Sequence, residues 1–398
     1  MKRLLFVSNL FPDTAAPYFG LDNATVLHAL AARHGWDIRV LCPRSSLSPG
    51  ALFGRGLALA CRAEDRAFDP RFVAVPYVPK LGGVANHTLM AAALRTPWVV
   101  LRKTFPFDVV LASWLFPDGA AAARLAEESG VPCLLITQGS DTHQYLLMPL
   151  RRRHILGTIG RSAGVIARSG DLARRLATAG ADVAKLHTIY NGVDVTVFRL
   201  RDRAEARRQL GLPLDAKMFL FVGNFLEVKN PQLLVRAFAR HCAASGGGSS
   251  LLIMAGKGPL SAEVAALAAS LGVGAHVRLT GPLDSAQIAS HMAAADLLCL
   301  SSRSEGFPNV ILEALACGLP VLSTDVGGIS ELVTPELGML VPEGDEPALS
   351  AALRACIDRA WDRGMIAATG ARHSWAGAAA AYDSLLRSAL PAGPGACG

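Results

Sequence analysis

Two glutamates eight residues apart form the most distinctive chemical pattern in the sequence. Both lie in the stretch 304–321, Glu305 near its start and Glu313 in its middle. In this stretch Pro308 is typical of a helix start and Gly318 of a helix end. Eight helical residues span about 12 Å, whereas the paired carboxylates of a glycosidase lie roughly 5–9.5 Å apart. The two glutamates are therefore expected to hold opposite ends of one elongated ligand.

The residues between the glutamates predict an anion site. They come from the first turn of the helix expected over 308–317, where backbone N–H groups favour phosphate. Lys229 follows the apolar run 219–223, so we expect it at the carboxyl edge of a sheet, where it would supply a cation for a diphosphate. The alternatives are glutamates that only cap or decorate a helix, and a solvated lysine.

Buried strands alternate with helices along most of the chain. Short apolar runs without period-two alternation are typical of strands covered on both faces of a parallel sheet. Such runs occupy 4–8, 38–42, 109–112, 133–137 and 164–167 in the first half, and 219–223, 251–255, 277–280, 297–300 and 321–324 in the second. With helical patterns such as 23–34 and 232–242 between them, they predict an α/β fold of two doubly wound, Rossmann-like domains.

We expect the first domain over 1–190, the second over 195–372, and a C-terminal helix over 373–390 that crosses back to the first domain. A ligand would then bind in a cleft between the carboxyl ends of two sheets. Residues 391–398 are predicted to be a disordered tail, and the Ser/Gly-rich stretch 245–250 a flexible loop tip. Neither of these is expected to carry chemistry.

The composition is that of a folded globular protein. The chain has 398 residues, of which 51% are hydrophobic and 18% charged, and its eight cysteines show no metal-ligand spacing, which favours a reducing compartment. No uninterrupted apolar run reaches about 18 residues, so no transmembrane helix is expected. The apolar start is cut short by Asn9 and Pro12, which indicates a buried strand instead of a signal peptide. We expect a cytoplasmic protein, or one peripheral at the inner face of the cell membrane.

The net charge of +7 is confined to the first half of the chain. Residues 1–195 contain 22 Lys and Arg against 14 Asp and Glu, whereas the remainder contains 17 against 18. This asymmetry predicts an anionic substrate or an anionic membrane surface, the alternative being a solvated basic face. The stretch 146–153 mixes apolar and basic residues and fits either membrane docking or a solvent-facing helix start. Nucleic acid is not an expected partner, because the basic residues are dispersed and no recognition motif is present.

Five groups of motifs resemble those of the family-4 retaining glycosyltransferases of GT-B fold, also called glycosyl transferases group 1. Segment 304–321 looks like the E-x7-E signature of that family. The others are 190–198, similar to its N-G-V-D-x-x-x-F segment, 222–229, similar to its V-G-x-x-x-x-x-K stretch, 255–259, similar to its G-x-G-P loop, and 114–119 with 139–141, similar to first-domain motifs of a bacterial subset. The resemblance covers about residues 1–386.

The resemblance implies a role for each matching residue. Glu305 would face the donor sugar, Glu313 would hold the ribose hydroxyls, and Lys229 would neutralise the diphosphate. Asp141 would contact acceptor or sugar and completes the catalytic candidates Glu305 and Lys229. Further donor contacts would come from Gly306, Phe307, Pro308, Asn309, Val310, Asn224, Gly20 and Gly258. No metal and no other cofactor is expected, because a lysine and a helix dipole would take the place of the metal.

The chain departs from the family pattern at two positions. Asn224 stands where the family usually carries Arg, and a neutral amide cannot supply the second charge of a diphosphate clamp. Gln138 stands where the family commonly carries His, and Gln cannot titrate near neutral pH. We therefore expect a basic residue from elsewhere in the chain to compensate, or weaker donor binding.

The function implied is transfer of a sugar, with retention, from a UDP-, GDP- or ADP-sugar to a hydroxyl of a glycan or lipid-linked acceptor. The expected setting is synthesis of a cell-surface polysaccharide or glycolipid. Three alternatives stay open: a sugar-nucleotide epimerase, a disaccharide synthase, and a non-catalytic sugar-nucleotide-binding homologue. A dinucleotide-dependent oxidoreductase is disfavoured, because neither domain carries Gly-x-Gly-x-x-Gly after its first strand. The motifs do not specify the base, the sugar, the acceptor or the oligomeric state.

Overall fold

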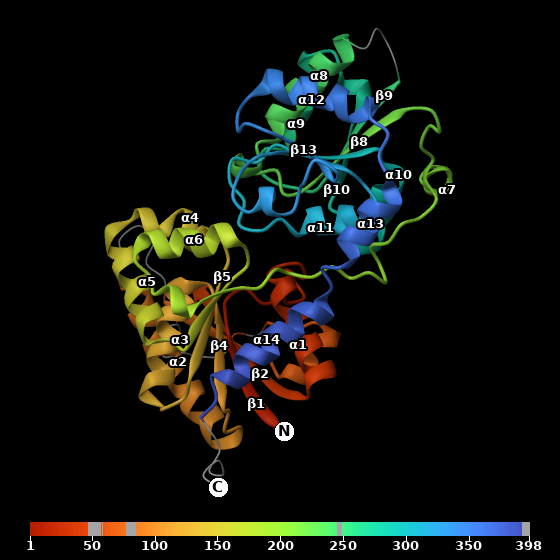
Figure 1. Cartoon of the computed structure of the whole chain (residues 1–398). Coiled ribbons are helices and arrows are strands. Elements are labelled where there is room, and N and C mark those ends of the chain that lie inside the picture. The colour runs from red at the N-terminus through yellow and green to blue at the C-terminus, as the bar shows by residue number, and fades with distance from the viewer. Residues whose placement is uncertain (47–56, 58, 77–84, 245–248, 392–398) are drawn as a thin grey trace. The chain divides into compact units, whose positions relative to one another are not determined.

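The computed structural model of the chain describes residues 1–46, 57, 59–76, 85–244 and 249–391. The chain divides into two compact units, Met1–Asn191 with Trp375–Gly398, and Gly192–Ser374. Each unit is a parallel sheet with helices on both faces, which confirms the predicted fold class (Figure 1). The predicted tail lies outside the described residues except for Pro391, and so does the predicted loop tip except for residues 249–250.

The first unit contains seven parallel strands in the order β3-β2-β1-β4-β5-β6-β7. Their bounds are β1 Lys2–Val7, β2 Trp36–Ser46, β3 Arg71–Pro76, β4 Val109–Ser113, β5 Cys133–Thr137, β6 Gly164–Ala167 and β7 Leu186–Thr188. The apolar N-terminus forms β1 at the centre of the sheet, with Leu4 to Val7 fully buried. The sequence pattern missed β3 and β7, which form the two edges of this sheet.

The helices of the first unit cover both faces of its sheet. The longer ones are α1 Leu21–His34, α2 Asn86–Thr104, α3 Ala120–Glu128, α5 Pro149–Arg161, α6 Gly170–Ala179 and α14 Trp375–Ser388, and the short ones are η2 Ala63–Phe68, η3 Leu115–Gly119, α4 Ser140–His143, η4 Tyr145–Leu147 and η5 Val183–Lys185. Helix α14 follows the second unit in sequence but packs against α1. Its Tyr382 lies in one apolar core with Leu27, and Trp36 Nε1 donates to Asp383 at 2.7 Å.

The second unit contains six parallel strands in the order β10-β9-β8-β11-β12-β13. They are β8 Lys217–Val222, β9 Ser250–Ala255, β10 Val277–Gly281, β11 Leu297–Leu300, β12 Val321–Thr324 and β13 Gly338–Val341. The helices are α7 Arg203–Gln209, η6 Glu227–Lys229, α8 Pro231–Ala244, α9 Ser261–Ser270, η7 Gly274–His276, α10 Ser285–Ala294, α11 Asn309–Ala316, η8 Ile329–Glu331, α12 Glu346–Asp358 and α13 Arg363–Ala371. The sequence pattern missed only the edge strand β13.

The two sheets share one strand order over six strands. In each, the first strand of the unit (β1 or β8) lies between the second and the fourth, so the order reverses beside it. Open parallel sheets bind ligands at the carboxyl ends of their strands near such a switch point. The loops after β1 and β4, and those after β8 and β11, are therefore the places where chemistry is expected. Among the residues that the structure describes, no helix is long and apolar enough to cross a membrane.

Candidate active site

Lys229 and Glu305 are 76 residues apart in the sequence and form one ion pair in the second unit. Lys229 Nζ donates to Glu305 Oε1 at 2.6 Å, and Ser302 Oγ donates to the same oxygen at 2.6 Å. Glu305 is only 7% exposed, whereas the lysine side chain is partly exposed. The pair follows β8 and β11, so two opposite charges are fixed at the carboxyl edge beside the switch point of this sheet.

Backbone contacts between two loops hold this pair in place. Lys229 ends the short helix η6 after β8, and Glu305 lies in the loop after β11. Arg303 N donates to Val228 O at 2.8 Å, and Ser301 Oγ donates to Asn230 O at 2.8 Å. The loop that carries Glu305 is therefore hydrogen-bonded to the segment that carries Lys229 on both sides of the lysine. The site does not depend on the side chains alone for its geometry.

Helix α11 carries Glu313 and begins one residue later than predicted. Pro308 has extended backbone and precedes the helix, which runs over Asn309–Ala316, and Gly318 follows it in the left-handed conformation at φ 70°, as predicted for the helix end. Because Glu305 lies outside the helix, the 12 Å separation expected for an all-helical stretch does not apply. The structure places Gly306, Phe307 and Pro308 in the turn before α11, and Asn309 and Val310 in its first turn.

Glu313 lies inside α11 and carries a carboxyl group that no residue of the described chain engages. Its side chain is only partly exposed, and within the described residues no hydrogen-bond or ion-pair partner contacts the carboxyl. Burial raises its pKa to about 7. A desolvated carboxyl without a protein partner is poised to accept hydrogen bonds from a ligand, since bonds to its charged form would offset that desolvation.

Asn224 and Gly258 lie in the loops after β8 and β9. Asn224 is exposed. A Cβ atom on Gly258 would lie 2.3 Å from Phe225 O, so close packing of the two loops requires glycine at this position. This packing places a second loop of the same sheet edge beside Asn224. The contact of either residue with a donor remains a prediction.

Two exposed cations of this edge escaped the sequence reasoning. Arg303 lies two residues before Glu305, and Lys257 lies in the loop after β9, where its carbonyl accepts from Phe225 N at 3.0 Å. Neither side chain forms an ion pair within the described part of the chain. Their only sequence signal was position, because Arg303 directly precedes the motif at 304–321 and Lys257 occupies the variable position of the motif at 255–259. They are candidates for the second positive charge of the diphosphate clamp, which the neutral Asn224 lacks.

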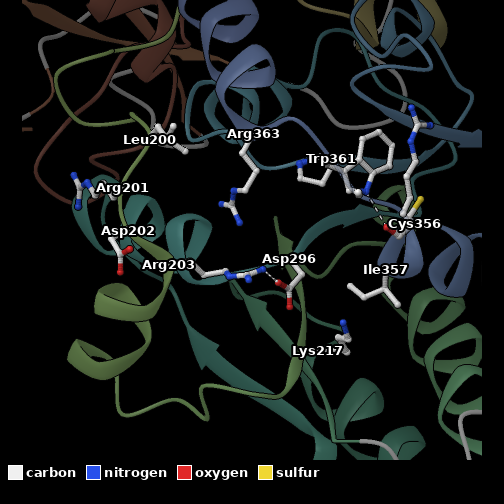
Figure 2. A pocket seen from close by; sticks show the side chains of 13 residues that line it. Leu200, Arg201, Asp202, Arg203, Lys217, Asp296, Cys356, Ile357, Trp361 and Arg363 are labelled. Atoms are coloured by element: carbon white, nitrogen blue, oxygen red, sulfur yellow. Dashed lines mark hydrogen bonds and ion pairs between the residues drawn. The ribbon is translucent and has the colours of Figure 1, made fainter.

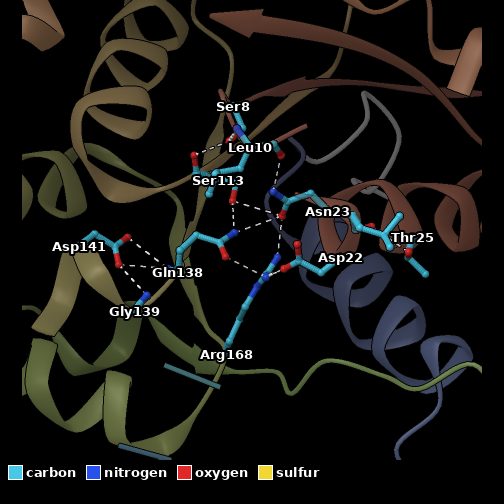
Figure 3. A network of polar contacts seen from close by, with 11 residues as sticks. Ser8, Leu10, Asp22, Asn23, Thr25, Ser113, Gln138, Gly139, Asp141 and Arg168 are labelled. Atoms are coloured by element: carbon cyan, nitrogen blue, oxygen red, sulfur yellow. Dashed lines mark hydrogen bonds and ion pairs between the residues drawn. The ribbon is translucent and has the colours of Figure 1, made fainter. Parts of the chain in front are cut away.

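The first unit carries a polar network at the carboxyl ends of its strands, centred on Arg168 (Figure 3). Arg168 follows β6 and is only 3% exposed. Its guanidinium donates to Gln138 Oε1 at 2.9 Å and to Asn23 Oδ1 at 2.6 Å, and it forms an ion pair with Asp22. Gln138 Nε2 in turn donates to Asn23 and to Ser113 Oγ. The sequence reasoning missed Arg168, because a lone arginine after an apolar run belongs to no motif.

Asp141 is fully buried, and its carboxylate is occupied by the protein itself. Oδ1 accepts from Thr137 Oγ1 at 2.8 Å and from Gly139 N at 2.9 Å, and Oδ2 accepts from Leu115 N at 2.9 Å. Burial raises its pKa against the effect of these bonds. The carboxylate thus ties the segment after β4 to the segment after β5, which is a positioning role. A direct contact of Asp141 with acceptor or sugar remains a prediction.

Gly20 precedes α1 in the left-handed conformation, at φ 72°. A Cβ atom there would lie 2.2 Å from the backbone carbon and oxygen of Leu10. Glycine is therefore required by the close approach of two segments of the first unit. An approach of Gly20 to phosphates of a donor remains a prediction.

The first unit also has a cavity of about 310 Å³, lined by residues of β2, β3 and α2 and by Asn9 and Trp114, which follow β1 and β4. The rings of Trp114 and Tyr145 stack at 6.1 Å between centroids, and both residues line the cavity together with Asn9. Asn9 Oδ1 and Trp114 Nε1 are buried polar atoms that have no hydrogen-bond partner among the residues the structure describes. Asp118 lies beside them and accepts from Asn9 N at 2.6 Å, and burial raises its pKa to about 7. The cavity therefore offers an aromatic wall with unsatisfied polar groups.

Within the described residues, no group of three or more His, Cys, Asp or Glu side chains is placed to hold a metal ion. The charges at the edge of the second sheet come instead from side chains and from the start of α11. The metal-independent reaction inferred from the resemblance stays a prediction.

The two Rossmann-like parallel sheets agree with the GT-B fold expected from the sequence. Residues 24–197 match Glycosyltransferase Family 4, and residues 202–371 match Glycosyl transferases group 1. The chain is 32% identical over 320 residues to D-inositol 3-phosphate glycosyltransferase 1 of Catenulispora acidiphila, over 74% of this chain and 76% of that protein. The chain therefore belongs to the glycosyltransferases of group 1, and the predictions of family, fold and enzyme class are confirmed.

Two further comparisons agree with this assignment. The chain is 29% identical over 372 residues, 88% of each protein, to the putative teichuronic acid biosynthesis glycosyltransferase TuaC of Bacillus subtilis. Its fold resembles that of Anabaena HepE, solved in complex with UDP, with a TM-score of 0.72 and 22% identity over 98% of this chain and 100% of that chain.

Proposed function

We propose that the enzyme transfers a sugar, with retention of configuration, from a nucleotide diphosphate sugar to an acceptor hydroxyl. The observation that carries this proposal is the Lys229–Glu305 ion pair at the carboxyl edge of the second sheet, followed in the chain by helix α11 with Glu313, whose carboxyl has no partner within the described residues. Lys229 would neutralise the leaving diphosphate, and Glu305 would accept hydrogen bonds from hydroxyls of the donor sugar. Glu313 would accept hydrogen bonds from both ribose hydroxyls.

The ion pair is compatible with donor binding. An ammonium group has three donors, so Lys229 can keep Glu305 Oε1 and still donate to phosphate oxygens. Among the described residues only Oε1 of the Glu305 carboxylate is engaged, which leaves Oε2 to accept a sugar hydroxyl. A fixed charge that is aimed at the leaving group before the reaction starts costs little reorganisation, and such terms usually dominate catalysis.

The balance of charge supports a reaction without a metal. Lys229 supplies one positive charge for the diphosphate, and Arg303 and Lys257 on the neighbouring loops would supply the charge that Asn224 lacks. The N–H groups at the start of α11 add partial positive charge. For the reaction itself, we propose a single-face course in which a donor phosphate oxygen accepts the proton of the acceptor hydroxyl.

We place the acceptor on the first unit. A sugar ring or another hydroxylated ring would stack on the Trp114 and Tyr145 wall, and its hydroxyls would satisfy Asn9 Oδ1 and Trp114 Nε1. We propose a glycan or lipid-linked acceptor in cell-surface polymer or glycolipid synthesis, which the name of the putative teichuronic acid biosynthesis glycosyltransferase supports. The name of the other relative, an inositol 3-phosphate glycosyltransferase, favours a small phosphorylated acceptor instead.

A peripheral membrane contact of the first unit belongs to the same proposal. Leu147 is 81% and Leu150 56% exposed, directly before the exposed Arg152 and Arg153 of α5. Exposed apolar side chains beside cations favour the interface of an anionic bilayer. Sedimentation with vesicles of phosphatidylglycerol and phosphatidylcholine, compared with phosphatidylcholine alone, tests this contact. Equal recovery with both would contradict it.

The first experiment is a thermal-shift panel of UDP-, GDP- and ADP-sugars with their free nucleotides. A ligand at a hundred times its Kd adds about 2.7 kcal/mol of stability, so one base class should stand out. The donor so found, incubated with candidate acceptors, should yield a product with the anomeric configuration of the donor by NMR. A new nucleotide sugar formed from donor alone would favour the epimerase alternative, and an inverted product would exclude the single-face course.

A further inference from the structure

The second unit has another cavity, of about 740 Å³, at the edge of its sheet opposite to Lys229 and Glu305 (Figure 2). Three of its lining residues mark the amino ends of strands. Lys217 is the first residue of β8, Asp296 precedes β11 and Pro320 precedes β12. The remaining walls come from residues 200–203 and from residues 356–363. Because the catalytic candidates follow the carboxyl ends of β8 and β11, this cavity is separate from the candidate active site.

Positive charge predominates in the lining. It contains the five cations Arg201, Arg203, Lys217, Arg359 and Arg363 and the two carboxylates Asp202 and Asp296. Both carboxylates are already engaged. Asp296 forms ion pairs with Arg203 and with the buried Arg207, and Asp202 caps α7 by accepting from Glu205 N at 2.7 Å. Within the described residues, the four cations other than Arg203 form no ion pair.

Arg363 is the most constrained of these cations. Its side chain is partly buried and extends toward the Arg203–Asp296 pair in Figure 2. Nη1 donates to Ala295 O at 3.2 Å, but Nη2 is a buried donor without a partner in the described part of the chain. Burial and the nearby Arg203 lower the pKa of this guanidinium. A buried unsatisfied donor is costly, and an anion in the cavity would satisfy it.

The other wall of the cavity is apolar, and a hydrogen bond fixes the orientation of its Trp361 ring. Trp361 Nε1 donates to Cys356 O at 2.8 Å, and the Arg359 guanidinium carbon lies 4.1 Å from the Trp361 ring centroid. Leu200, 46% exposed, lines the same cavity. Cations near the end of α12 would also be favoured by its negative helix end. That effect does not explain an unpartnered Nη2 on Arg363 or an apolar wall beside it.

We propose that this cavity is a second ligand site that binds a small phosphorylated organic molecule. Arg363, Arg203 and Lys217 would hold the phosphate, because guanidinium groups match phosphate oxygens with paired hydrogen bonds. Trp361 and Leu200 would contact the organic part. The cavity volume lies within the range of small-molecule sites, roughly 300–1,000 Å³. This site does not depend on the donor or acceptor roles proposed above.

The test is isothermal titration calorimetry of the full chain with glucose 6-phosphate at about 0.1 M salt. Lys229→Ala serves as background, because it removes the phosphate-binding cation of the other edge. We expect a Kd below about 1 mM in wild type and in Lys229→Ala, and binding at least tenfold weaker in Lys217→Gln/Arg363→Gln. Lys217→Gln alone, at an exposed residue, keeps the test valid where the double variant fails to fold, and should weaken binding severalfold.

Two controls determine the outcome. Arg278→Gln removes an exposed cation of the same unit that does not line the cavity, and should leave the Kd unchanged. Glucuronic acid replaces the phosphate by a carboxylate and should bind at least tenfold more weakly. The proposal is overturned by an absence of binding, by equal affinity for glucuronic acid, by binding that Lys229→Ala abolishes, or by equal binding in the cavity variants.

Discussion

The two sheets of this enzyme share one strand order over six strands, but the polar cluster around Arg168 in the first unit and the site around Lys229 in the second differ in how far the protein itself satisfies their polar groups. At the edge of the first sheet, Arg168, Gln138 and Asn23 bond mainly to one another and are largely buried. At the edge of the second sheet, the Lys229–Glu305 pair stays partly exposed, and Glu313 has no partner among the described residues. Polar groups that bond mostly to one another fix the backbone around them, whereas a group without a protein partner can gain hydrogen bonds from a ligand.

Loss of the Lys229 ammonium should have the largest effect. Lys229→Ala removes the fixed cation for the leaving group, and we expect kcat/KM to fall about 10²–10³-fold, or roughly 3–4 kcal/mol, with weaker donor binding. Steady-state kinetics with the identified donor measure this loss. Lys103→Ala, at an exposed lysine of α2, is the matched control and should keep full activity. A Lys229 variant with unchanged donor Kd and kcat would refute the phosphate assignment.

Loss of Glu305 should separate turnover from binding. Glu305→Gln keeps the size of the side chain but removes the charge that faces the donor sugar, so kcat should fall more than donor affinity, by about 10²-fold. Kinetics give kcat, and calorimetry with the free donor gives the Kd. A variant in which only the Kd rises would assign Glu305 to uniform binding instead.

Asp141→Asn tests the hydrogen bonds that the Asp141 carboxylate accepts in the first unit. The substitution replaces a carboxylate that accepts from Leu115 N, Thr137 Oγ1, Gln138 N and Gly139 N by a group that donates at one position, and we expect a loss of about 1–3 kcal/mol in the free energy of unfolding. Urea denaturation measures it. If Asp141 only positions the loops, kcat at low temperature should recover in a variant stabilised elsewhere. A loss of kcat in a folded protein that such stabilisation leaves unchanged would favour the catalytic role.

Much of this arrangement was predictable from the sequence, because it rests on local patterns. Short apolar runs without alternation predicted ten strands, and the E-x7-E segment predicted the end of α11 at Gly318. The missed strands β3, β7 and β13 lie at sheet edges, where neighbours in space decide pairing. Arg168 was missed for the same reason: its partners Asp22 and Asn23 are about 145 residues away in the sequence. Spacing alone also gave no indication that the Asp141 carboxylate would already accept hydrogen bonds from backbone N–H groups.

The pH dependence of the free energy of unfolding should show that Glu313, unlike Asp141, is desolvated without a partner for its carboxyl among the described residues. Its pKa is raised to about 7 in the folded enzyme and is near 4.5 when unfolded, so the folded state holds the extra proton between these values. Stability is therefore lost as pH rises from about 4.5 to 7. Glu313→Gln should gain stability relative to wild type at pH 8 compared with pH 5, by on the order of 1–2 kcal/mol.

Thermal unfolding at the two pH values measures this difference for Glu313. Glu263→Gln, at an exposed glutamate of α9, is the control and should show the same offset from wild type at both. Saturating nucleotide should shrink the pH effect of Glu313 in wild type, because ribose hydroxyls favour its ionised form. A pH-independent offset for Glu313→Gln would mean that its carboxyl is well solvated and not poised for a ligand.

The smallest expected effect comes from restoring a charge at Asn224. Asn224→Arg adds a second cation to the exposed loop after β8, so donor affinity should rise about threefold to tenfold, and more at low salt. The gain should be larger when Arg303→Gln has first removed the neighbouring cation. If Arg303 and Lys257 already supply the missing charge, the two effects are non-additive, and a double-mutant cycle on donor Kd detects this. Strict additivity would show that Arg303 does not compensate for Asn224.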